Sequence, residues 1–123
     1  LNKNEFLGDM TTTLPFINGF DLVYSISINE RLALKTAQIT LFDNELKNND
    51  PLVADNLAET ANIIGCNICS KLETIGIKCE IYLPQVYKRD GDKPYDFSSR
   101  KNNIIFELIA PHETIYIGLE YDE

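Results

Sequence analysis

The sequence predicts an α+β domain in which an antiparallel β-sheet carries two main helices packed on one face. Segments near both ends of the 123-residue chain alternate apolar and polar side chains, as half-buried strands do. Two segments between them repeat apolar residues at helical spacing. Short turn signals separate neighbouring strands, and strands joined by hairpins pair antiparallel. Helices that fall between such strands pack together on the sheet.

The first strand pair is expected around the dipeptide Asn18-Gly19, which favours a tight hairpin turn. Leu14 to Ile17 would form the strand before the turn. The strand after it alternates apolar with polar residues, and its apolar members are Phe20, Leu22, Tyr24, Ile26 and Ile28. Residues 1–13 are polar and without pattern. We therefore expect an N-terminal arm over residues 1–13 and a single domain over residues 14–123.

Both helices have start signals. A capping box from Ser27 to Glu30 predicts a helix to about residue 41, with Asn29 as a rival cap. Its inner face would carry Leu34, Ala37 and Leu41. Asp50-Pro51 predicts the start of a second helix, which would run to about residue 74 and stop at Gly76.

Three further strands are expected after the helices. Residues 77–83 alternate up to Pro84, and segments 104–109 and 115–121 are rich in isoleucine. A turn over residues 110–114 would join the last two strands into a hairpin. The charged stretch between Tyr87 and Asn103 is expected to be a loop.

Composition narrows the classes of function. The net charge of −8 argues against a nucleic-acid partner, whose phosphates would be repelled. No apolar run approaches the roughly 18 residues that a membrane span needs, and the first residues contain no signal-peptide core. We therefore expect a cytoplasmic protein with neither a nucleic-acid nor a membrane partner.

The three cysteines, Cys66, Cys69 and Cys79, are expected to be reduced thiols, since their number is odd and no export signal is present. Cys66 and Cys69 form a C-x-x-C pair, which metal and redox sites use. A zinc site needs four ligands, however, and the only histidine, His112, is distant in the sequence. The pair also falls inside a helical pattern rather than at a helix start. Metal or redox chemistry is the less favoured alternative, and we expect no metal site.

The second helix carries the candidate chemistry. At about 100° per residue, one side is apolar and must face the core: Leu57, Ala61, Ile64, Ile68, Leu72 and Ile75. The opposite side carries Asp55, Glu59, Asn62, Cys66, Cys69 and Glu73. Residues three or four apart are neighbours on a helix, so Asp55, Glu59 and Asn62 point the same way. Such a face is usually only solvated, but its small and apolar members are also typical of a face that another protein covers.

The run Asp55-Asn-Leu-Ala-Glu59-Thr-Ala-Asn62 resembles the D/S-x-x-x-E-x-x-N signature of the CheC/CheX/FliY chemotaxis phosphatases. The flanking segments are similar to those of the family too, in the strand and first helix upstream and in Leu83-Pro84-Gln-Val86 downstream. The resemblance covers about residues 14–90, and a single copy of the motif is typical of the CheX branch.

The chain departs from the family pattern at three places. Cys66, with Gly65 beside it, stands where the family tends to have glycine four residues after the motif asparagine. Lys88 and Arg89 stand where a glycine usually follows the Pro-x-Val strand. The leading helix of the family has no counterpart in this chain. None of these departures touches the motif itself.

The resemblance implies a phosphatase that hydrolyses the aspartyl-phosphate of a CheY-like response regulator in chemotaxis signalling. Asn62 would orient the attacking water and Glu59 would pair with the active-site lysine of the receiver, while Asp55 would help to dock the receiver or hold the surroundings of Glu59. The receiver would supply Mg²⁺, so no cofactor of the chain's own is expected. The alternative is a non-catalytic receiver-binding adaptor or flagellar-switch component of the same fold. A domain with no receiver partner is a weaker third interpretation.

The resemblance also implies a homodimer, since the CheX branch pairs through strand edges. The segments 104–109 and 115–121 are apolar, lack interior proline and have only Lys101 and Glu107 as charges in or before the first of them. An exposed edge of this kind is normally paired, covered or charged. The alternative is a monomer in which a further N-terminal helix covers the edge.

Overall fold

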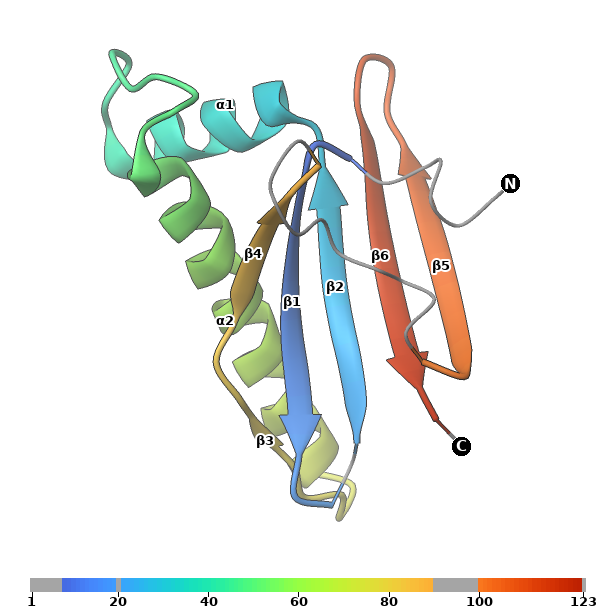
Figure 1. The fold of residues 1–123 in the computed structure, drawn as a ribbon. Helices are drawn as coiled ribbons and strands as arrows, with labels where there is room; N and C mark the ends of the chain where they lie inside the picture. The colour runs from blue at the N-terminus through green and yellow to red at the C-terminus, as the bar shows by residue number, and fades with distance from the viewer. Residues whose placement is uncertain (1–7, 20, 90–99, 123) are drawn as a thin grey trace.

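The computed structural model describes residues 8–19, 21–89 and 100–122, which form one antiparallel sheet and two helices (Figure 1). In chain order the elements are β1 (Met10–Ile17), β2 (Leu22–Ile28), α1 (Glu30–Leu41), α2 (Pro51–Glu73), β3 (Glu80–Ile81), β4 (Gln85–Lys88), β5 (Asn102–Ile109) and β6 (Thr114–Tyr121). The predicted fold class, an antiparallel sheet with two main helices, is confirmed.

The sheet has the strand order β3-β1-β2-β6-β5, and β4 also pairs with β1. β4 lies beside the first half of β1, where Met10 pairs with Lys88, and β3 lies beside its end, where Ile17 pairs with Glu80. Between β3 and β4 the Tyr82 N–H donates a hydrogen bond to the Pro15 carbonyl of β1 at 2.8 Å. Pro84 lies between β3 and β4 and has no N–H to donate to a neighbouring strand. The edge of the sheet beside β1 is therefore interrupted there and consists of two short strands, β3 and β4.

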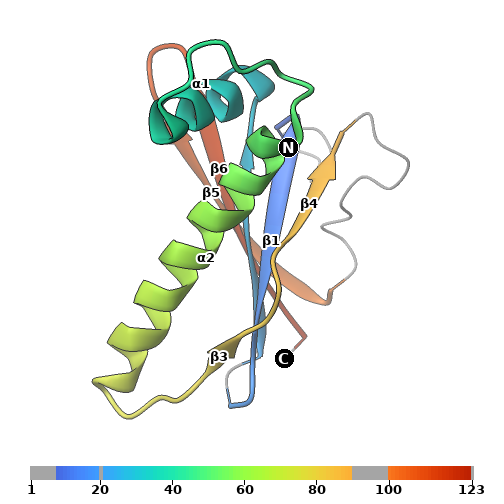
Figure 2. The same ribbon diagram turned by 90° about the vertical axis from the view of Figure 1, so that its left-hand side faces the viewer.

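Both helices lie on the same face of the sheet, and α2 crosses the β3-β1-β4 side at an angle (Figure 2). The core forms where the helices meet β1 and β2. Its buried members from the sheet are Met10, Leu14, Phe16, Tyr24, Ile26 and Ile28, and those from the helices are Ala33, Ala37, Val53, Leu57 and Ala61. The hydrophobic core therefore sits under one half of the sheet.

The first strand is longer than the sequence predicts. It was expected from Leu14, but β1 begins at Met10, so residues 10–13 belong to the sheet and not to an N-terminal arm. All four residues are buried. Three of them are threonines, which are polar by composition but β-branched, and β-branched side chains pack well in a sheet. The Thr11 hydroxyl shares a hydrogen bond with Ser27 at 2.9 Å, whereas the buried Thr12 hydroxyl has no hydrogen-bond partner among the described residues. Phe20 lies outside the described residues.

The helix caps follow the local sequence, with one correction. Asn29 is the cap of α1, and its Oδ1 accepts a hydrogen bond from the Leu32 N–H at 2.7 Å. The capping role predicted for Ser27 is wrong, because its hydroxyl is buried inside the sheet beside Thr11. At α2 the prediction is confirmed: Asp50 Oδ1 accepts from the Leu52 N–H at 2.9 Å. Gly76 follows the helix with a φ of 85°, which glycine adopts without strain.

The inner face of α1 differs from the predicted one. Ala33 and Ala37 are buried and Leu34 is half-buried, but Leu41 is 42% exposed. Leu41 is the last residue of the helix, where the chain turns away through Phe42 in the left-handed region. Leu46 from the following loop is buried in the core cluster instead.

Of the strand expected over residues 77–83, only Glu80 and Ile81 pair, as β3. The strand that the family resemblance implies at the Pro-x-Val segment is present as β4. The last two strands are confirmed, as β5 and β6. Their hairpin closes where the Ala110 N–H donates to the Glu113 carbonyl at 2.8 Å. Of the expected charged loop, residues 90–99 lie outside the described residues.

The helices leave the β5-β6 side of their face uncovered (Figure 1). On β5, Ile104, Phe106 and Leu108 share that face and are 44–51% exposed. Beside them an apolar groove of about 530 Å³ runs between the sheet and α2, with Ile115, Ile117 and Leu119 of β6 in its wall.

Gly65 of α2 faces the sheet at a point where there is no room for a side chain. A Cβ at Gly65 would lie 2.2 Å from Cδ2 of Leu14, a fully buried side chain. We expect Gly65→Ala to lower the free energy of unfolding by about 1 kcal/mol, because overpacking costs about 1–3 kcal/mol and outweighs the gain of about 1 kcal/mol in helix propensity. Urea denaturation of the variant and the wild type measures this change in the free energy of unfolding.

The matched control is Asn67→Ala, at an exposed position of the same helix, which should be neutral or slightly stabilising. A Gly65→Ala protein as stable as the wild type would show that the contact between α2 and β1 is looser than the structure indicates.

Candidate functional site on helix α2

The buried stripe of α2 determines which side chains point outward. Val53, Leu57, Ala61 and Gly65 are buried, one every four residues. Four residues advance about 400°, so this stripe winds slowly round the helix. It leaves Ile64 36% exposed beside the apolar groove, and Ile75, beyond the helix end, is 70% exposed. The predicted apolar stripe is therefore correct at Leu57 and Ala61 and wrong at Ile64 and Ile75.

The candidate residues lie on the outward side. Asp55 and Glu59 are exposed and Asn62 is half-buried. All three belong to the middle of a regular 23-residue helix, so their spacing of four and three residues places them on one surface. Cys66 and Glu73 are exposed as expected. Cys69 is not outward: it is half-buried and packs against the core, because the buried stripe has wound toward it.

Two apolar residues on this surface were not singled out from the sequence. Ile63 is 54% exposed and Leu52 is 47% exposed. Ile63 follows Glu59 by four residues and so lies beside it on the helix. The signal was present in the sequence, because both residues fall outside the apolar stripe on the helical wheel. The outward surface of α2 thus combines carboxylates, a carboxamide and exposed aliphatic side chains.

The three candidate residues line neither the apolar groove nor the hollow by the β5-β6 turn. The apolar groove is lined on its helix side by Asn56, Thr60 and Ile64, which lie on the neighbouring side of α2. The other hollow lies at the far end of the sheet, by the β5-β6 turn. Asp55, Glu59 and Asn62 therefore form an open helix surface and not a closed pocket. Chemistry that must exclude water can occur on such a surface only when a second molecule covers it.

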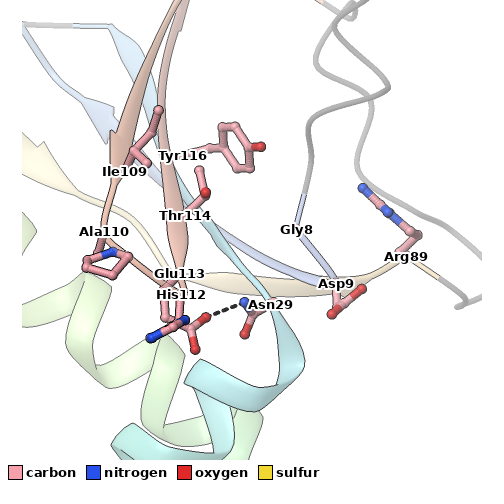
Figure 3. A pocket seen from close by; sticks show the side chains of 11 residues that line it. Gly8, Asp9, Asn29, Arg89, Ile109, Ala110, His112, Glu113, Thr114 and Tyr116 are labelled. Carbon is pink, nitrogen blue, oxygen red and sulfur yellow. Dashed lines mark hydrogen bonds between the residues drawn. The ribbon is translucent and has the colours of Figure 1, made fainter.

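The hollow at the β5-β6 turn, of about 580 Å³, is polar and is lined by residues of four segments (Figure 3). The carboxylate of Glu113 faces the Asn29 amide, which donates a hydrogen bond to it. Arg31 also donates to Glu113, and to the His112 carbonyl at 3.1 Å. These hydrogen bonds, first that from Asn29 and then that from Arg31, hold the pKa of Glu113 below its usual range. The cluster fastens the hairpin to the start of α1.

Two further findings concern metals and membranes. Within residues 8–19, 21–89 and 100–122, no three His, Cys, Asp or Glu side chains are grouped so that they could hold a metal ion. In the same part of the chain, neither helix has the length and apolar character that crossing a bilayer requires.

The family model for the chemotaxis phosphatase CheX matches residues 10–107, which is most of the chain and includes all of α2. This chain belongs to the CheX family. The candidate residues Glu59 and Asn62 thus lie within the family region and on its outward helix surface. None of the curated proteins compared with the chain matches it.

Solved structures share the fold. A CheC-like superfamily protein from Shewanella sp. PV-4 has a TM-score of 0.81 at 19% identity, over 100% of this chain and 79% of its own. CheX from Vibrio vulnificus has a TM-score of 0.75 at 20% identity, over 93% and 76%. A CheX-CheY-BeF3-Mg complex from Borrelia burgdorferi has a TM-score of 0.74 at 21% identity, over 93% and 76%. At such identities the likeness establishes the CheX-like fold.

The Glu113 cluster makes stability depend on pH. A carboxyl group whose pKa is lowered in the folded state stabilises the fold above its unfolded pKa of about 4.3, and this contribution is lost as the pH falls through the folded value. We expect Glu113→Gln to lower the urea midpoint at pH 7, and the difference from wild type to shrink as the pH falls below 4.

Glu45→Gln is the control, since it makes the same charge change at an exposed position of the loop between the helices. A difference between Glu113→Gln and wild type that stays constant from pH 7 to pH 3 would contradict the role assigned to the carboxylate.

Proposed function

We propose that this protein hydrolyses the aspartyl-phosphate of a CheY-like response regulator, and that Glu59 and Asn62 of α2 act on it. The observation that carries the proposal is the outward placement of this acid and amide on a rigid helix within the CheX family region. The family relative from Borrelia burgdorferi was solved with CheY, BeF3 and magnesium. A CheY-like receiver is therefore the partner that we propose for this chain.

Asn62 would orient the water that attacks the phosphorus. Phosphoryl transfer requires a nucleophile in line with the leaving oxygen and needs little covalent chemistry from the protein. A carboxamide can donate one hydrogen bond and accept another, so it can hold a water in a fixed direction. Because it is neutral, it does not repel the phosphoryl oxygens as a second carboxylate would. Positioning of this kind can lower a barrier by several kcal/mol.

Glu59 would form an ion pair with the active-site lysine of the receiver. Its negative charge lies one helical turn from Asn62, and a cationic partner is needed there to offset repulsion from the phosphoryl group. Asp55, one turn further along, would contribute to docking. The receiver would bring the magnesium ion, so α2 contributes only its own side chains to the joint site.

The exposed aliphatic residues support a docked complex. Ile63 lies beside Glu59, and Leu52 extends the same side of the helix toward its start. Apolar side chains at the centre of an interface exclude water from the polar groups around them. Since α2 offers an open surface, the receiver must form the other wall of the reaction site.

The alternative is a receiver-binding adaptor or flagellar-switch component that docks through the same surface without hydrolysis. The presence of both Glu59 and Asn62 favours the phosphatase. The test is to mix the protein with a CheY-like regulator that has been phosphorylated by a small-molecule phosphodonor. Phosphate release faster than the regulator's own rate supports the phosphatase, whereas binding with no acceleration supports the adaptor.

We expect Asn62→Ala to reduce the stimulated dephosphorylation by about 100-fold or more, the usual loss when one positioned group is removed from a transition state. Binding and folding should change little, because Asn62 is outside the buried stripe. Asn67→Ala removes an exposed asparagine from the same helix and should keep full activity. Near wild-type turnover by Asn62→Ala would rule out its role in orienting water.

Glu59→Lys should weaken binding to the phosphorylated regulator, since it sets a positive charge against the receiver's lysine. Glu59→Ala should bind better than Glu59→Lys and still turn over poorly. Glu73→Lys makes the same charge change at an exposed position near the end of α2, and it controls for net charge. A titration that gives equal affinities for Glu59→Lys and wild type would remove the ion pair from the mechanism.

The protein is also proposed to form a homodimer through the edge of β5. β5 is the last strand in the sheet order, and no other strand of the described residues pairs with its outer side, whereas β6 lies inside the sheet between β2 and β5. Glu107 is its only charged residue. A two-fold partner would extend the sheet and form an isologous interface.

Light scattering at micromolar concentration should give a mass of about twice 14.0 kDa. A mass near 14.0 kDa would instead indicate a monomer whose β5 edge is covered in another way.

A further inference from the structure

A cluster of thiols lies where the end of α2 meets the strand edge. The Sγ atoms of Cys69, on α2, and Cys79, just before β3, are 3.1 Å apart. Both residues are half-buried, and Cys66, one turn before Cys69, is exposed. Nothing in the proposed phosphatase chemistry uses these groups. The contact joins two elements that are separated by the turn through Gly76.

We propose that Cys69 and Cys79 are a redox-sensitive pair that forms a reversible disulfide by exchange with low-molecular-weight disulfides. The bond would tie the last turns of α2 to the edge of the sheet. This inference does not depend on the proposed phosphatase activity.

The geometry favours this pair over the C-x-x-C pair of the sequence. A disulfide needs a Cβ separation of about 3.5–4.5 Å, whereas residues three apart on a regular helix have their Cβ atoms about 5–6 Å apart. Cys66 and Cys69 are both inside α2, so they could close only by distorting the helix. Cys79 follows the helix and the Gly76 turn, and its sulfur already lies against that of Cys69. The sulfurs need to approach by only about 1 Å more to reach bonding distance.

The chemistry balances as two exchange steps. The Cys79 thiolate attacks one sulfur of the small disulfide, which forms a mixed disulfide and releases one thiolate. The Cys69 thiolate then attacks the Cys79 sulfur and displaces the second thiolate. The protein loses two thiol protons and two electrons, and the small disulfide becomes two thiols. Burial, together with the hydrogen bond to Cys79, raises the pKa of Cys69 to about 12, which makes Cys69 a poor first nucleophile. In the second step its small thiolate fraction is offset by position, because its sulfur already lies against that of Cys79.

The bond would act on the helix that carries the candidate site. Cys69 is seven residues from Asn62, which is about 10 Å along a helix that rises 1.5 Å per residue. Closing the segment from Cys69 to Cys79 restricts the unfolded chain and holds the end of α2 on the sheet. The expected consequence is a more stable fold whose helix frays less at its end.

The test is to incubate the folded protein with oxidised glutathione and to digest it with trypsin without reduction. Cleavage after Lys47, Lys71, Lys78 and Lys88 separates Cys69, in peptide 48–71, from Cys79, in peptide 79–88. The proposal predicts that mass spectrometry finds these two peptides joined, with dithiothreitol separating them. The oxidised protein should also melt about 5 °C or more above the reduced protein.

Cys66→Ser is the matched control and should keep both the joined peptides and the shift in melting temperature. Cys79→Ser should lose both. Peptide 48–71 also contains Cys66, so fragment spectra of the joined wild-type peptides are needed to locate the bond on Cys69, and this reading does not depend on how well a variant folds. Three outcomes would overturn the proposal: a bond from Cys66 to Cys79, a disulfide within peptide 48–71 between Cys66 and Cys69, or glutathione adducts on the cysteines with no joined peptides.

Discussion

The close contact of α2 with β1 is the constraint on which the rest of the structure depends. Ala61 and Gly65 present almost no side chain to the sheet, so the helix backbone can lie directly over Leu14, which is completely buried. A helix held this closely cannot rotate without driving a larger side chain into the core. The rotation of α2 therefore decides which residues reach solvent. Glu59 and Asn62 point outward because Ala61 and Gly65 point inward.

The same contact explains why the two halves of the sheet are buried to different degrees. The helices bury β1 and β2, where the core residues gather, and they leave the β5-β6 hairpin with apolar side chains that are half exposed on the same face. The hairpin is held by its pairing with β2 and, at its turn, by the hydrogen bonds that Arg31 and Asn29 make to Glu113. Ile115, Ile117 and Leu119 of β6 pack only partly against the core cluster, so polar interactions at the turn add to the hold on this side of the sheet.

An open helix surface suits chemistry that is divided between two proteins. Asp55, Glu59 and Asn62 lie outside the apolar groove and outside the hollow at the β5-β6 turn, so in the proposed reaction the chain brings orientation and a partner brings the phosphorylated group. Rigid presentation matters more than a pocket in such an arrangement, because the catalytic contribution comes from positioning. The end of the same helix is where Cys69 meets Cys79, so the stability of the helix and the presentation of its outward residues are physically linked.

The sequence by itself determined the fold class, both helices with the Asp50 cap and the Gly76 stop, the final hairpin, and the common direction of Asp55, Glu59 and Asn62. These features follow from local rules: periodicity, capping and turn chemistry operate over a few residues, and all their signals lie within a short stretch of chain. Family membership came from the same short stretches and was confirmed over residues 10–107.

Features that depend on contacts between segments distant in the sequence were decided only by the tertiary structure. The start of β1 at Met10, the interrupted edge strand of β3 and β4, the exposure of Ile64 and the contact of Cys69 with Cys79 each require two segments to be placed against one another. A helical wheel assumes a straight boundary between the buried and the exposed side, but a stripe that repeats every four residues winds round the helix as it crosses the sheet. That winding turned Cys69 inward, because the partner surface, and not the helix alone, determines which residues are buried.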